Sequence, residues 1–262
     1  MAGIKLHGAI DAYIHHNRIH RCGSFGVWLD WMGQGARISS NLFYHNISAD
    51  LFTEVDHGPM LVDNNILLSP YSIRENADGI AYVHNLFCGS TANMNDGRYV
   101  PYHLNHSTQI KGFKSIVNGD HRYYNNIFIG GNLEKEKYGL AGYKAAQLPI
   151  YAAGNLFCNG ALLAEESQGM VINGHVSAPE VEETDEEVYL ILPDEVGMMK
   201  QVKTESVDAA RLGKARLSNY GYESQDGMPV NLEKDYAGKN RSKERPLVGP
   251  IEHVNGKRMK VW

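Results

Sequence analysis

The segment "NLFYHN", residues 41–46, begins with an asparagine followed by an apolar run, and similar words recur along the chain. They are "NRIH" from Asn17, "NILL" from Asn65, "NLFC" from Asn85, "NIFI" from Asn126 and "NLFC" from Asn155. The steps between these six asparagines are 24, 24, 20, 41 and 29 residues. Self-similarity at such a period indicates supersecondary units that stack on one another.

Each unit is rich in Ile, Val, Phe and Tyr, with turn residues between short apolar runs, which is typical of strands. A unit of this length with about three strands has the size of one coil of a parallel β-helix, so we predict an all-β solenoid. The leucine spacing of a leucine-rich repeat is missing, and a β-sandwich would not repeat the same words. We expect each asparagine to occupy a tight turn in left-handed geometry. The 41-residue step predicts two coils, or one coil with a long loop through residues 94–114.

The composition of the chain limits the kinds of molecule that it is expected to bind. The 262 residues carry a net charge of −5 with scattered basic residues, which argues against nucleic acid and anionic membranes. No apolar run approaches the roughly 18 residues that a membrane span needs. Three cysteines cannot all pair, which favours a reducing, cytoplasmic location. A neutral or weakly polar small substrate fits this composition best.

The repeat divides the chain into three parts. Residues 1–160 are expected to form the parallel β-helix coils that carry the site. Residues 161–206 include the run "EVEETDEEVY" and are expected to form an acidic insertion or hairpin on the rim. Residues 207–262 suit terminal coils or a cap. Because the chain opens directly on a strand-like segment, we also expect an N-terminal companion segment or a homo-oligomer.

Two carboxylates fall at the same place in consecutive coils. Asp30 lies eleven residues before Asn41, and Glu54 lies eleven residues before Asn65. In stacked strands such equivalent positions are about 4.7–4.9 Å apart. Alternation in "GVWLDW" and "LFTEVD" directs both acids to the outer face of the coil. Three more side chains are expected on that face: Trp28, Phe52 and Asp56.

The first coil extends this pattern. Aligning "GIKLHG" with "GVWLDW" on their opening glycines places His7 in the row of Asp30 and Lys5 in the row of Trp28. The polar row is expected to continue beyond the two carboxylates to Arg74. The sequence therefore predicts a polar ladder beside an aromatic one.

Aromatic side chains accompany the acids. Trp28 is expected to stack over Phe52 and to offer a surface for a sugar ring, whereas Trp31 should face the core. Two carboxyl groups about 5–5.5 Å apart form the arrangement of retaining glycoside hydrolysis. Since one of two close acids must hold a proton more firmly, we predict Asp30 as the nucleophile and Glu54 as the acid and base.

Two residues after Glu54 are further candidates. Asp56 and His57 are predicted to bind substrate hydroxyls, although an ordinary turn at "DHGP" accounts for them equally well. The cluster "HHNRIHRC" could suggest zinc, but it crosses a proposed turn and strand and lacks a second ligand set. We therefore predict neither a metal nor a cofactor.

The words "GVWLDWMGQGARISSNLFYHN" and "DLFTEVDHGPMLVDNNILLS" resemble glycoside hydrolase family 120, the β-xylosidase family. The resemblance covers about residues 1–160. It implies a right-handed parallel β-helix and a retaining, exo-acting β-xylosidase on xylo-oligosaccharides. The nucleophile of the family falls on Asp30 and its acid/base on Glu54, and both positions carry the required residue type.

Two other functions are compatible with this fold. A polysaccharide lyase would need a Ca²⁺ cluster, or an Arg or Lys base beside an acidic sugar, and the mixture around Asp30 fits a neutral sugar better. A non-catalytic carbohydrate-binding or structural β-helix is the second alternative. In that case Trp28 and Phe52 would hold sugars without cleaving them.

Overall fold

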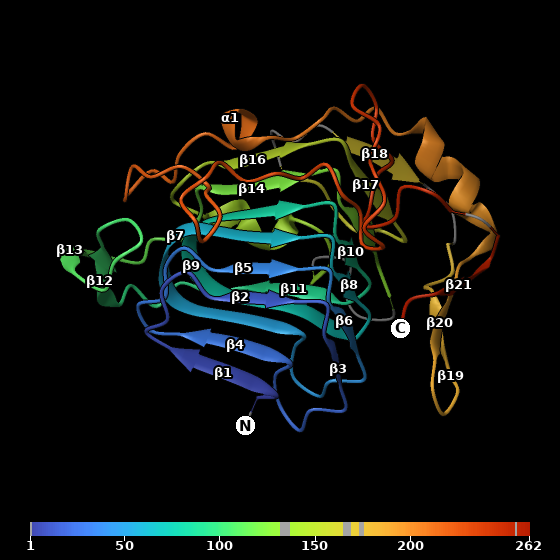
Figure 1. Ribbon diagram of the computed structural model, residues 1–262, viewed down its shortest axis with the longest axis horizontal. Coiled ribbons are helices and arrows are strands. Elements are labelled where there is room, and N and C mark those ends of the chain that lie inside the picture. Colours follow the sequence, from blue (N-terminus) through green and yellow to red (C-terminus); the bar gives the residue numbers. More distant parts are fainter. Residues whose placement is uncertain (1, 132–136, 165–168, 173–175, 255) are drawn as a thin grey trace.

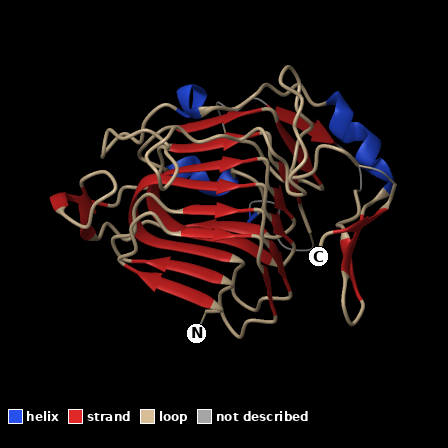
Figure 2. Ribbon diagram, viewed as in Figure 1, coloured by secondary structure: helices blue, strands red, loops and turns tan. Residues whose placement is uncertain are grey.

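The computed structural model describes residues 2–131, 137–164, 169–172, 176–254 and 256–262. Nearly all of the regular structure is strand (Figure 2). The helical elements of this described part are short: η2 (Ala141–Ala145), η3 (Asp194–Gln201) and α1 (Ala209–Leu212). None of its helices combines the length and the apolar character that crossing a membrane requires.

Within these segments the chain forms two large parallel sheets. The nine-stranded sheet contains β1 (Ile4–His7), β2 (Tyr13–His15), β4 (Val27–Asp30), β5 (Arg37–Ser39), β7 (Leu51–Asp63), β9 (Tyr71–Val83), β11 (Ser90–Asn93), β14 (His121–Tyr124) and β16 (Ile150–Ala153). The seven-stranded sheet contains β3 (Arg18–His20), β6 (Leu42–Tyr44), β8 (Ile66–Leu67), β10 (Leu86–Phe87), β15 (Ile127–Ile129), β17 (Asn155–Cys158) and β18 (Gly169–Ile172).

Successive turns of the chain lie side by side in these sheets. The order β1-β4-β7-β9-β14-β16 runs through one sheet, and β3-β6-β8-β10-β15-β17-β18 runs through the other (Figure 1). The prediction of an all-β chain with stacked parallel strands is thus confirmed. Strand β10 pairs directly with β15, so the 41-residue step is one coil with a long loop. Strand β11 pairs with β9 and belongs to the coil, and the loop that follows carries the antiparallel hairpin of β12 (Tyr99–His103) and β13 (Ile110–Ser115).

A ladder of asparagines joins the coils at one corner. The Oδ1 of Asn41 accepts hydrogen bonds from both the main-chain N–H and the Nδ2 of Asn17, at 3.0 Å each. The same pair of bonds links each later asparagine to the next one, through Asn65, Asn85, Asn126 and Asn155. Each amide group also reaches a main-chain carbonyl, as Asn65 does at Ile38 (2.8 Å). The repeated words therefore fix the register of the stack.

The turn geometry at this corner differs from the sequence-based expectation. The left-handed residue is the one that precedes each ladder asparagine, with φ between 49° and 57° at His16, Ser40, Asn64, His84 and Asn125. The ladder asparagine itself must point both its main-chain N–H and its side chain at the next coil. The reversal of chain direction consequently falls one residue earlier.

The interior of the stack is apolar and aligned from coil to coil. The rings of Phe87 and Phe128 stack at 4.9 Å, and those of Phe128 and Phe157 stack at 5.0 Å, measured between centroids. These residues and Phe43 belong to one buried cluster. Each coil alone would expose this face, so stacking is what removes it from water.

The C-terminal third covers the outside of the sheets. Val207, Leu212 and Tyr222 pack on Leu61 and Val83, whose side chains point away from the interior. In Figure 1 the orange and red segments run across the strands, and in the described part of 207–262 the only strand, β21 (Arg258–Lys260), pairs outside both sheets. This segment is an outer covering and adds no coil to the stack. The acidic run lies on β19 (Glu180–Glu183) and the turn after it, and β19 pairs antiparallel with β20 (Val188–Ile191), which also pairs with β21.

Replacing Asn65 by alanine should destabilise the protein by at least about 2 kcal/mol, because the buried amide groups of Asn41 lose their acceptor. Urea unfolding followed by circular dichroism measures this loss. Asn17→Ala is the matched control, since Asn17 lies at the end of the ladder and is only partly buried. Equal losses in the two variants would contradict a stabilising role for the ladder.

Candidate active site

The register of β1, β4, β7 and β9 aligns the predicted polar row. His7 pairs with Asp30, Asp30 with Glu54, and Glu54 with Asn76. The row predicted for the first three residues is confirmed, but its continuation to Arg74 is wrong. Arg74 lies opposite Phe52, in the neighbouring row that begins with Lys5 and Trp28. The error arose because strand pairing, and not the next charged residue in the sequence, decides which side chain continues a row.

Both carboxylates are near the surface and carry cationic partners. The side chain of Asp30 is 14% exposed and that of Glu54 is 18% exposed. The Nζ of Lys5 lies 2.8 Å from Asp30 Oδ2. The Nη2 of Arg98 lies 2.5 Å from Glu54 Oε1. Two like charges on adjacent strands repel each other, and these two cations offset that repulsion.

The second oxygen of Glu54 is held by Trp28. The indole Nε1 donates to Glu54 Oε2 at 3.0 Å. Arg98 occupies the other oxygen and also donates from its Nε to Asp96 Oδ2 at 2.6 Å. Glu54 is therefore held by a neutral donor, Trp28, and by a cation, Arg98. Arg98 also bonds a second carboxylate, that of Asp96.

The predicted aromatic surface is not open. Phe52 lies in the outer row of Trp28 and Arg74, as alternation predicted, but neighbouring side chains bury it there. Its ring stacks on Trp28 with centroids 5.4 Å apart. The Nζ of Lys5 lies 3.3 Å from the centroid of Trp28, and the Arg74 guanidinium lies 4.8 Å from that of Phe52. Since neighbours occupy the faces of Trp28, its structural role is to orient Glu54.

Asp56 and His57 are buried as well, which corrects the outward orientation expected for Asp56. The register of β7 against β9 shifts after Glu54, where Val55 has a φ of 55°. This irregularity reverses the alternation. Asp56 Oδ1 then accepts the main-chain N–H of Gly33 at 2.6 Å, and His57 Nδ1 lies 3.6 Å from Asp78 Oδ2.

Burial raises the pKa of the Asp56 carboxyl well above its usual range, and the nearby charges of Asp30 and Glu54 raise it further. A protonated Asp56 adds no third negative charge beneath the carboxylate pair. Asp56 thus supports the turn after Asp30 through Gly33, and a substrate at the surface does not reach it.

Sequence reasoning missed Arg98, Asp96 and Asn76. Both Arg98 and Asp96 belong to the long loop. Arg98 bonds Glu54 from 44 residues further along the chain, and Asp96 bonds Arg98. No local spacing marks them. Asn76 is buried and pairs with Glu54 on the neighbouring strand. That position in the next coil is the one feature of the sequence that could have identified it.

Glu75 lies inside the coil. It is fully buried and pairs with His121 Nε2 through one oxygen. Its other oxygen accepts from the hydroxyls of Tyr82 and Tyr143. Burial, followed by the charge of Glu75, raises the pKa of both tyrosines well above the usual range, so they remain hydrogen-bond donors. This network gives the buried polar groups behind the polar row their hydrogen-bond partners. It adds no side chain to the row itself.

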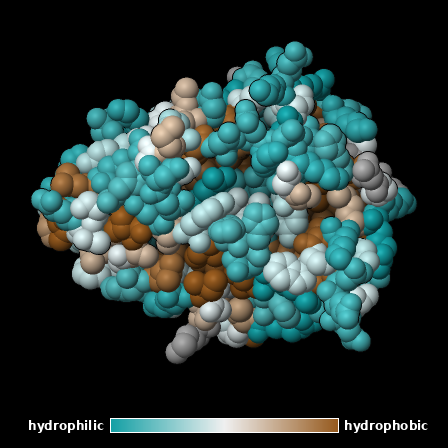
Figure 3. Space-filling model, viewed as in Figure 1, coloured by the Kyte–Doolittle hydropathy of each residue, from teal (hydrophilic) through white to brown (hydrophobic). Residues whose placement is uncertain are grey.

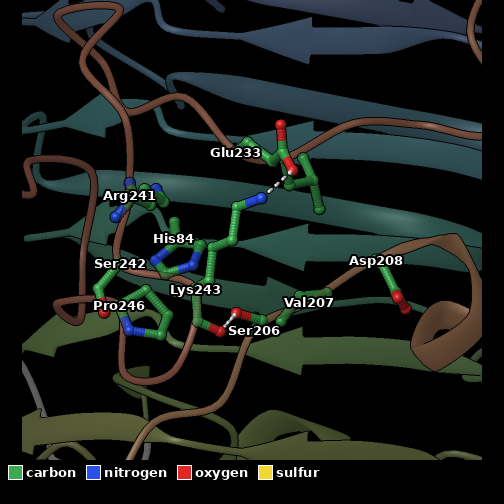
Figure 4. Close-up of a pocket in the computed structure, with 10 residues that line it drawn as sticks. His84, Ser206, Val207, Asp208, Glu233, Arg241, Ser242, Lys243 and Pro246 are labelled. Atoms are coloured by element: carbon green, nitrogen blue, oxygen red, sulfur yellow. Dashed lines mark hydrogen bonds and ion pairs between the residues drawn. The ribbon is translucent and has the colours of Figure 1, made fainter.

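A separate hollow of about 230 Å³ lies between His84 and the C-terminal covering (Figure 4). Burial lowers the pKa of His84 well below its usual range, so the imidazole is neutral there. At the edge of this hollow, the Nζ of Lys243 lies 3.9 Å from Glu233 Oε1. None of the predicted site residues lines this hollow. In the described segments, no three His, Cys, Asp or Glu side chains converge as metal ligands.

A comparison with solved structures identifies a protein similar to this chain. This chain is similar to XylC. The structure concerned is the complex of XylC with xylose, and the two chains share 37% sequence identity with a TM-score of 0.89. The match covers all of this chain and 45% of the XylC chain, so the chain spans less than half the length of that relative. No protein-family model and no curated protein matches the sequence.

Asp56→Asn should change how stability depends on pH. The raised pKa of Asp56 means that its contribution to stability is fully present below the ordinary pKa of 3.8 and is lost as the pH rises through the raised value. Asparagine keeps the acceptor for Gly33 and does not titrate. The melting temperature of the variant relative to wild type should therefore increase from acid to alkaline pH. Asp56→Leu, which lacks the acceptor, should be less stable throughout, and a constant offset for Asp56→Asn would contradict the assignment.

Proposed function

We propose that the chain carries the catalytic pair of a retaining glycoside hydrolase, an exo-acting β-xylosidase on xylo-oligosaccharides, built on a right-handed parallel β-helix. The observation that carries this proposal is the pairing of Asp30 with Glu54 on adjacent strands at the surface. Adjacent parallel strands are about 4.8 Å apart, which suits two carboxyl groups that act as nucleophile and acid/base. Parallel connections are almost always right-handed, which supports the handedness.

The reaction proceeds in two steps. Asp30 attacks the anomeric carbon while protonated Glu54 gives its proton to the glycosidic oxygen, so the bond to the leaving alcohol breaks and a glycosyl ester forms on Asp30. Glu54, now a carboxylate, takes a proton from water. The resulting hydroxide equivalent attacks the anomeric carbon and releases Asp30 and the sugar.

The neighbouring side chains fit these roles. The Nζ of Lys5 lies 2.8 Å from Asp30 Oδ2 and is a cationic partner for the attacking carboxylate. Trp28 and Arg98 each donate a hydrogen bond to one oxygen of Glu54, so both oxygens of the acid/base are held in place. When Glu54 carries a proton, Arg98 keeps Asp96 as its partner, so its charge does not become unpaired.

The similarity to XylC supports a pentose as the sugar. That protein was solved with xylose, and this chain matches it over its full length at 37% identity. A pyranose without a hydroxymethyl group is the ligand class that this relative binds. We therefore assign β-linked xylose as the residue released.

A fluorinated xylosyl donor that traps the glycosyl-enzyme should label Asp30, and mass spectrometry of the digested protein locates the adduct. Asp30→Asn should abolish hydrolysis of an aryl β-xyloside. Glu54→Gln should lower the rate by about 10²–10⁴-fold on substrates with poor leaving groups and much less on activated ones. A label on Glu54 would reverse the roles. Wild-type protein that binds xylosides but does not cleave them would favour a carbohydrate-binding module.

Trp28→Phe should reduce kcat by roughly 10- to 100-fold, because a hydrogen bond to a charged group is worth about 1.5–3 kcal/mol. Phenylalanine keeps a ring on Phe52 but lacks the indole N–H that holds Glu54. Steady-state kinetics on the aryl xyloside measure the change. Glu233→Gln, at the separate hollow, is the control and should leave kcat unaltered. Unchanged kcat in Trp28→Phe would remove Trp28 from the catalytic arrangement.

A further inference from the structure

The chain immediately after Asp30 adopts an unusual conformation. Trp31 has a φ of 29° and Met32 a φ of 64°, both in the left-handed region that bulky residues seldom occupy. Such outliers persist where the surrounding structure holds them, and they gather at functional sites. Here two such residues in succession directly follow the proposed nucleophile, Asp30.

Hydrogen bonds from the next coil hold this turn. The main-chain N–H of Trp31 donates to Glu54 O at 3.0 Å, and that of Met32 donates to Val55 O at 3.4 Å. The third bond, from Gly33 to the Asp56 carboxyl, is the shortest of the set at 2.6 Å. The same strand pair that aligns the two acids therefore also fixes the direction of the Trp31 side chain.

The effect of the turn is to expose an indole. Alternation predicted Trp31 in the core, whereas it is 40% exposed. Its ring packs at an angle of 51° against that of His7, with centroids 5.4 Å apart. His7 is the strand partner of Asp30. The exposed ring thus stands beside the polar row, on the side away from Glu54.

Other aromatic side chains are less suited to hold a sugar at Asp30. Trp28 is covered by Lys5 and Phe52. Apolar surface also gathers at the β12–β13 end of the molecule (Figure 3), where Tyr99 and Phe113 are exposed. Those two rings stack on each other at 5.8 Å, and they belong to the hairpin.

We propose that Trp31 is the aromatic wall of the sugar subsite at Asp30, where its ring packs on the apolar face of a pentopyranose. The choice of ligand rests on the proposed function. Xylose has no hydroxymethyl group, so its C–H bonds form a flat face that an indole can cover. Because the strained turn fixes the ring before the ligand arrives, little conformational entropy is lost on binding. The ring of His7 packs against the indole.

Calorimetric titration of xylobiose tests this subsite. It is performed on Asp30→Asn protein, which leaves the ligand intact. Adding Trp31→Ala should weaken binding by about tenfold or more, and adding Trp31→Phe should restore most of the affinity. Adding Phe113→Ala is the matched control on the exposed hairpin and should have no effect. Melting temperatures of all four proteins establish that each is folded.

Fluorescence gives an independent measurement, since the chain has three tryptophans. Xylobiose should protect part of the emission from acrylamide, and this protection should persist in Trp262→Phe and vanish in Trp31→Phe. Unaltered affinity in Trp31→Ala, or no binding by the Asp30→Asn parent, would overturn the subsite. Wild-type protein that binds xylobiose through Trp31 but cleaves no xyloside would instead overturn the hydrolase and leave the subsite standing.

Discussion

The hydrogen bonds from each ladder asparagine to the next constrain everything else in the structure. They fix the register at one corner of every coil, and a strand that slipped by one residue would turn its side chains to the opposite face. Asp30 and Glu54 are each eleven residues before a ladder asparagine, Asn41 and Asn65. Their pairing is therefore a consequence of the same bonds that hold the stack together.

This dependence explains what could be predicted from the sequence. The ladder words, the strand content and the row of His7, Asp30 and Glu54 all follow from period and alternation, and the structure contains them. Alternation fails at Val55, where a left-handed residue shifts the register and turns Asp56 inward. No residue type at that position signals the change, because valine is a common strand residue.

A different limit applies to contacts made by distant segments. Arg98 reaches Glu54 from an inserted loop, and only the folded chain shows which of the loop's polar residues does so. Whether an aromatic ring is exposed to solvent also depends on tertiary packing. Trp28 and Trp31 differ by three positions, yet the first is covered by Lys5 and the second is exposed by a turn. Alternation alone placed Trp31 in the core, and the structure exposes it.

The inserted loop that carries Arg98 is itself tied to two other parts of the molecule. His106 in this loop bonds Asp11 and Glu223 through its two ring nitrogens, at 2.9 Å each. Hydrogen bonds to Glu223 and then to Asp11 raise the pKa of His106, because both carboxylates favour the imidazolium. The first coil, the inserted loop and the C-terminal covering thus meet at the imidazole of His106. An insertion anchored at both sides can present a guanidinium to Glu54 reproducibly, which a free loop of this length would not do. The C-terminal covering consequently contributes to the site without supplying a residue to it.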